Sequence, residues 1–77
     1  MTKRELIECL KKENVPTDAY CLEGGLPNDR YCVVKTNSGW EVYYSEMGKK
    51  YEAKGFASEE DAYDYLYVCL KKMMEYM

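Results

Sequence analysis

Apolar residues recur with the spacing of an α-helix near the start of the chain. In residues 2–13 they lie three and four positions apart, at Leu6, Cys9 and Leu10. Thr2 followed by Glu5 is typical of a helix start, because each side chain can bond the other residue's backbone N–H. The Val15-Pro16 pair ends the segment, since the residue before proline avoids the helical conformation. The pattern predicts a short amphipathic helix.

A longer helix is predicted at the other end of the chain. Its continuous apolar stripe consists of Ala62, Tyr65, Leu66, Cys69, Leu70 and Met73. Ser58 is expected to cap its start, with Asp61 three residues later. The carboxylates at residues 59–61 suit the positive end of the helix dipole.

Three segments between the helices have the composition of β-strands, at residues 30–36, 40–46 and 51–56. Residues 15–29 are rich in proline, glycine and aspartate and predict a loop, with a short extended piece at Tyr20–Leu22. The expected fold class is α+β, in the order α-β-β-β-α. It would be a three-stranded antiparallel meander with two helices packed on one face, and residues 1–77 would form a single domain.

The hairpin loop decides which strand residues face the core. A three-residue loop at Asn37-Ser38-Gly39 would pair Thr36 with Trp40. The core face would then consist of Cys32, Val34, Thr36, Trp40, Val42 and Tyr44. The opposite face would be open to water and would carry Tyr31, Val33, Lys35, Glu41, Tyr43 and Ser45.

The open face is the candidate partner-binding surface. Two tyrosines beside a valine, with charges at the edge, are typical of a docking patch, which would be formed by Tyr31, Val33, Glu41 and Tyr43. The alternative is that tyrosine is present only because it favours strands. Glu46, at the strand end, either pairs with Arg30 or caps the following turn, or it presents a carboxylate to a basic site on a partner.

Composition favours a protein partner over nucleic acid. The 77 residues carry a net charge of −3 and include nine tyrosines. The expected element order is shared with double-stranded-RNA-binding domains, which place basic residues at the start of the last helix. This chain has Glu59, Glu60 and Asp61 there, which would repel phosphate. We expect no nucleic-acid partner.

The four cysteines show no metal-binding spacing. There is no C-x-x-C motif, and the chain has no histidine. The start of the chain lacks the apolar run of a secretory signal, and no stretch is long enough to span a membrane. We therefore expect a cytoplasmic protein with reduced thiols, in which Cys9, Cys32 and Cys69 are core residues and Cys21 lies in a loop.

The residues also argue against catalysis. Without histidine, no Ser-His or Cys-His pair can form. Glu41 and Glu46 lie five positions apart on one strand, so they face opposite sides and cannot act as paired carboxylates. We expect no enzyme activity and no cofactor or metal.

A resemblance adds to this picture. The run W-E-V-Y-Y-S-E-x-G at residues 40–48, followed by F-x-S-E-x-x-A at residues 56–62, resembles a core found in small bacterial immunity proteins of polymorphic-toxin systems. The segment G-G-L-P-N-D-R-Y-C at residues 24–32 is similar too, and Met47 stands where the pattern usually has arginine. The resemblance covers roughly residues 20–70.

The resemblance implies a cytoplasmic protein that binds and blocks one toxin domain by occlusion. Two alternatives from other classes remain open: a small acidic phage- or plasmid-type regulator of a host protein, and a structural homodimer joined through the tyrosine face. A neighbouring toxin gene would distinguish the first role from the second, and the molar mass in solution tests the third.

Overall fold

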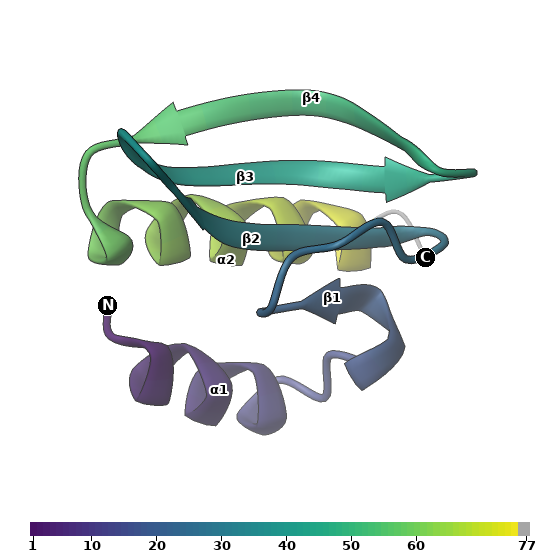
Figure 1. Ribbon diagram of the computed structural model, residues 1–77. Coiled ribbons are helices and arrows are strands. Elements are labelled where there is room, and N and C mark those ends of the chain that lie inside the picture. Colours follow the sequence, from purple (N-terminus) through teal and green to yellow (C-terminus); the bar gives the residue numbers. More distant parts are fainter. Residues whose placement is uncertain (76–77) are drawn as a thin grey trace.

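The computed structural model describes residues 1–75 as two helices packed against a sheet (Figure 1). The elements in chain order are α1 (Lys3–Lys12), the short 3-10 helix η1 (Thr17–Ala19), β1 (Tyr20–Cys21), β2 (Arg30–Thr36), β3 (Gly39–Glu46), β4 (Lys49–Phe56) and α2 (Glu59–Glu75). The α+β class and the two helices agree with the prediction from the sequence.

The sheet has four strands rather than the expected three. Its order is β1-β2-β3-β4, and β1 runs parallel to β2 while the other neighbours are antiparallel. The short extended piece expected near Tyr20 therefore exists, but it joins the sheet as an edge strand. The sheet is mixed, and the prediction of a purely antiparallel meander is wrong in this detail.

Both helix starts are capped as the sequence predicts. The backbone N–H of Glu5 donates to Thr2 Oγ1 at 3.2 Å, and the Thr2 N–H donates to Glu5 Oε1 at 2.9 Å. At the start of α2 the Asp61 N–H donates to Ser58 Oγ at 3.1 Å. These bonds satisfy backbone donors that have no partner within the helix.

The core lies between the sheet and the two helices. It is built around the fully buried side chains of Leu6, Leu10, Val33, Val42, Leu66 and Leu70. In Figure 1, α2 runs along one face of the sheet and α1 lies beyond β1. Trp40 also lies on this side, where the centroid of its ring is 6.1 Å from that of the Tyr63 ring.

The β2–β3 hairpin differs from the expected one by a single residue. Thr36 pairs with Gly39 and Lys35 pairs with Trp40, so the loop contains only Asn37 and Ser38. Gly39 enters the ladder with φ +150°, where an added Cβ would lie 2.3 Å from the Phe56 carbonyl oxygen. A shift of one residue turns every β2 side chain to the opposite face.

This shift corrects the predicted core face on β2. Val33 pairs with Val42 and faces the helices, whereas Cys32 pairs with Tyr43 on the other side of the sheet. On β3 the prediction was right for Trp40 and Val42, because the register leaves that strand's own alternation unchanged.

The second face of the sheet is covered by the loop at residues 22–29. Tyr43 Oη donates to the Gly25 carbonyl at 2.5 Å, and Ser45 Oγ donates to the Pro27 carbonyl at 2.6 Å. Gly24 lies so close to the sheet that a Cβ would come within 2.7 Å of Val34 Cγ2. The face expected to be open to water is therefore largely closed by this chain's own loop.

Candidate functional site

The proposed binding residues do not form one surface. Val33 is 0% exposed in the core, and Tyr43 is 2% exposed beneath the loop. Tyr31 lies on the helix side of the sheet, while Glu41 lies on the other side and pairs with Lys50 Nζ at 2.9 Å. The predicted patch is wrong as a single open face, because the hairpin register separates its members and the loop buries one of them.

Glu46 lies at the end of β3, opposite Lys49 of β4. Its predicted cross-strand partner Arg30 instead lies opposite Ser45, and the Arg30 guanidinium is 3.7 Å from Asp18 Oδ1. Arg30 and Glu46 are therefore not cross-strand neighbours: Arg30 lies near Asp18, and Glu46 lies opposite Lys49. The role of Glu46 toward a partner stays a prediction.

A row of tyrosines crosses the sheet on the helix side. One tyrosine from each strand stands in register with the next: Tyr20, Tyr31, Tyr44 and Tyr51. The Tyr31 and Tyr44 rings meet edge to face, with centroids 4.9 Å apart. The first three are partly buried, whereas Tyr51, on the edge strand β4, is 44% exposed.

Helix α2 forms the other wall of a hollow beside this row. The hollow has a volume of ≈ 320 Å³ and is lined by Tyr31, Glu52, Tyr65, Val68, Cys69 and Lys72. We call these six residues the tyrosine groove. Val68 is 46% exposed, so the groove presents an aliphatic side chain as well as ring surface to the solvent.

Glu52 reaches the tyrosine groove because β4 contains a β-bulge. Tyr44 pairs with Tyr51 and Val42 pairs with Lys54, so β4 carries one residue more than β3 in this interval. Glu52 has φ +55°, a left-handed conformation that is costly for a residue with a Cβ. Bulges re-aim side chains, and here the bulge brings a carboxylate to the groove.

An aromatic cluster borders the groove toward the start of α2. The Phe56 and Tyr65 rings lie 5.1 Å apart, and Lys54 Nζ sits 4.8 Å from the Tyr65 ring centroid. This cation–π contact holds the Lys54 ammonium over the ring. Aromatic rings and a positive charge therefore lie next to the groove on this side.

The two tyrosine hydroxyls and the thiol of the groove, those of Tyr31, Tyr65 and Cys69, stay neutral near neutral pH. Burial raises the pKa of Tyr31 and of the Cys69 thiol, and the nearby Cys69 raises the pKa of Tyr65. Raised pKa values make hydroxyl and thiol groups weaker nucleophiles at pH 7. This chemistry suits contact with a partner better than proton transfer.

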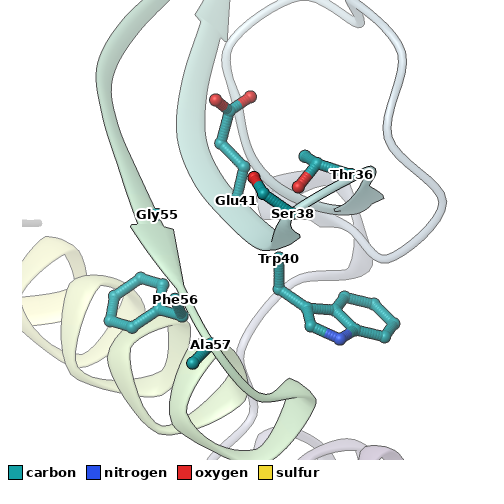
Figure 2. Close-up of a pocket in the computed structure, with 7 residues that line it drawn as sticks. All are labelled: Thr36, Ser38, Trp40, Glu41, Gly55, Phe56 and Ala57. Atoms are coloured by element: carbon teal, nitrogen blue, oxygen red, sulfur yellow. The ribbon is translucent and has the colours of Figure 1, made fainter.

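A larger hollow of ≈ 480 Å³ lies at the opposite end of the sheet (Figure 2). Trp40 and Glu41 are consecutive strand residues, so their side chains point to opposite sides, as Figure 2 shows. Glu41 is already paired with Lys50. The polar groups here do not converge on one point, so this hollow is a weaker candidate than the tyrosine groove.

Within residues 1–75, no three His, Cys, Asp or Glu side chains are placed to hold a metal ion. None of the helices in that range is both long and apolar enough to cross a membrane.

Periodicity along single strands could not reveal the tyrosine row, because its members become neighbours only through the strand register. Tyr65 and Val68 were visible only as parts of a helix. The signal that existed was the tyrosine content itself, with nine copies in 77 residues.

Comparison of the chain with protein-family models, with curated proteins and with solved structures finds no match in any of the three.

Proposed function

We propose that this protein is an immunity protein that binds a cognate bacterial toxin domain and blocks it by occlusion, with the tyrosine groove as its docking surface. The observation that carries the proposal is an aromatic groove that Glu52, held in a left-handed conformation at the bulge, helps to line. Backbone strain of this kind concentrates at functional sites.

The groove has the composition of a protein-binding surface. Tyrosines are enriched in interfaces, where each ring supplies a large contact area and a hydroxyl that can bond a partner. Tyr31 of the sheet and Val68 of α2 both line the groove, so a partner side chain that enters it could contact both. Charges at the rim, from Glu52 and Lys72, would govern orientation.

The resemblance to immunity proteins supports the role, and the structure explains the shared residues as parts of the fold. Tyr43 and Ser45 of the W-x-V-Y-Y-S-E run donate hydrogen bonds to Gly25 and Pro27 of the upstream G-G-L-P-N-D segment. Two of the three segments that carry the resemblance are thus bonded to each other. We infer that they maintain the scaffold, and that residues outside them, such as Tyr51, Glu52 and Val68, select the toxin.

The test uses the toxin domain encoded beside this protein's gene, expressed in a bacterial host with and without this chain. Wild-type chain should restore growth and bind the purified, catalytically inactive toxin domain. Val68→Asp should weaken binding more than about thirtyfold, equivalent to about 2 kcal/mol, because it places a charge in the apolar centre of the interface.

Leu26→Asp is the matched control, because Leu26 is an exposed aliphatic residue (50%) in the loop on the other side of the sheet. It should bind like the wild type. Failure of the wild type to restore growth would exclude the immunity role toward that toxin. Loss of binding in Leu26→Asp but not in Val68→Asp would move the docking surface to the loop.

A further inference from the structure

Two cysteines stand directly opposite each other in the parallel pair of strands. Cys21 of β1 is the register partner of Cys32 of β2. Paired strands lie about 4.8 Å apart, so partner residues fall within the range of Cα separations that a disulfide can span. Both thiols are free in the structure.

The pair lies under the loop, on the face of the sheet away from the helices. Cys32 pairs with Tyr43 on β3, so Cys21, Cys32 and Tyr43 form a row across three strands. The Cys21 thiol donates to the Gly24 carbonyl at 3.3 Å, and the Tyr43 hydroxyl donates to the Gly25 carbonyl at 2.5 Å. Two members of this row, Cys21 and Tyr43, thus form hydrogen bonds to two successive glycines of the loop.

We propose that Cys21 and Cys32 form a redox-sensitive dithiol, which a low-molecular-weight disulfide converts into an intramolecular bond joining β1 to β2. The other two cysteines offer no such pair: Cys9 is on α1 beside Tyr67, and Cys69 is on α2 in the tyrosine groove.

The order of reaction follows from the surroundings of the two sulfurs. Cys21 is partly exposed, whereas Cys32 is fully buried. Burial, with a smaller contribution from Cys21, raises the pKa of Cys32 to about 11, so Cys32 is a thiol at neutral pH. Cys21 is therefore the first to react, and Cys32 is the resolving group.

The two steps balance without any other reactant. The Cys21 thiolate attacks one sulfur of the small disulfide, forms a mixed disulfide and releases one small thiol. Cys32 then loses its proton and attacks Cys21 Sγ, and the second small thiol leaves. The protein dithiol is oxidised to a disulfide and the small disulfide is reduced to two thiols.

Oxidation would change how the loop is held. The S–H donor to the Gly24 carbonyl is lost when Cys21 enters the disulfide, while the Tyr43 bond to Gly25 stays. The edge strand β1 would at the same time become covalently fixed to β2. Oxidation of the Cys21–Cys32 pair would therefore alter the contacts of the loop that covers this face.

The test uses a Cys9→Ser, Cys69→Ser variant, which keeps only the proposed pair. This folded variant is treated with oxidised glutathione, and the released reduced glutathione is counted. Release of two equivalents per chain is expected, with a monomeric product in which digestion recovers a peptide linking Cys21 and Cys32.

Adding Cys32→Ser to the same background is the matched control. It should release one equivalent and keep a stable glutathione adduct on Cys21. Circular dichroism before treatment checks that each variant is folded. A second control replaces both Cys21 and Cys32 with serine and keeps Cys9 and Cys69, and it should form no internal disulfide. A persistent adduct, a dimer linked between chains, or no reaction in the two-cysteine variant would overturn the proposal.

Discussion

Tyr43 and Tyr51 lie on adjacent strands, but the first is buried and the second is exposed to solvent. Tyr43 is buried under the loop, its hydroxyl bonds the Gly25 carbonyl, and burial raises its pKa to about 12. Tyr51 lies at the β4 edge and is nearly half exposed. Removing the same hydroxyl from each should therefore have different consequences.

Tyr43→Phe should lower the free energy of unfolding by about 1–2 kcal/mol, because the Gly25 carbonyl loses its donor in a partly buried place. Tyr51→Phe should change it by less than about 0.5 kcal/mol. Urea unfolding of both variants checks this. Equal stabilities would mean that the loop is not held through Tyr43.

The sequence alone predicted the β3 alternation correctly at Trp40 and Val42, but it placed Val33 and Tyr43 in water. Alternation assigns residues to two faces and cannot tell how many faces are covered. Coverage of the second face depends on a loop 18 positions away along the chain from Tyr43. No local pattern contains that information.

At the scale of elements, the β2–β3 hairpin requires glycine at position 39. The Phe56 carbonyl oxygen lies only 2.3 Å from the place that a Cβ on Gly39 would take, and Gly39 has φ +150°. Gly39→Ala should destabilise the protein by at least about 2 kcal/mol, because strain and a backbone clash act together. Thermal or urea unfolding measures the change.

Gly48→Ala is the control for backbone strain alone. Gly48 also has a positive φ, +76°, but nothing lies within 4 Å of its added Cβ. It should cost about 1 kcal/mol. If Gly39→Ala were no worse than Gly48→Ala, the close approach of β4 would not constrain the hairpin.

The two helices are joined by Glu13, which follows α1. Its carboxylate accepts hydrogen bonds from Lys71 and from the Tyr67 hydroxyl of α2. The bond from Lys71, followed by that from Tyr67, lowers the pKa of Glu13 below its ordinary value. A group whose pKa is lower in the folded state adds stability above its unfolded pKa, and that stability disappears as the pH falls.

Glu13→Gln should therefore be less stable than the wild type at pH 7, and the difference should shrink as the pH falls through about 4.3 toward the lower pKa of the folded state. Glu8→Gln, on the exposed side of α1, should show little difference at either pH. Urea unfolding at several pH values checks both variants. A difference for Glu13→Gln that does not change with pH would assign its effect to packing.

The element types were predictable because periodicity and capping act locally. The start of each helix and the three main strands follow from spacing and from Thr2, Glu5 and Ser58. The pairing of β1 was not predictable, since a strand of two residues, Tyr20–Cys21, has no alternation to detect. The tyrosine row depends on that pairing, and the tyrosine groove depends on the hairpin register and on the bulge at Glu52.

At the scale of the whole molecule, the exposed edge of the sheet bears on self-association. Strand β4 is an edge strand of eight residues, and it carries Lys49, Lys50 and Lys54 together with the bulge at Glu52. Lysines and bulges on an edge oppose pairing with another copy of the same strand. The edge is therefore a poor surface for the homodimer alternative, and the tyrosine groove is the surface to test for it.

We expect the free protein to be a monomer of 9.1 kDa, with the groove available to a partner. Light scattering across a range of concentrations, up to well above those used in binding titrations, measures the molar mass directly. A dimer that persists on dilution and dissociates in Val68→Asp would identify the groove as a contact between two copies. In that case toxin binding, if present, would have to compete with dimerisation, and the apparent affinity would fall as the concentration of the protein rises.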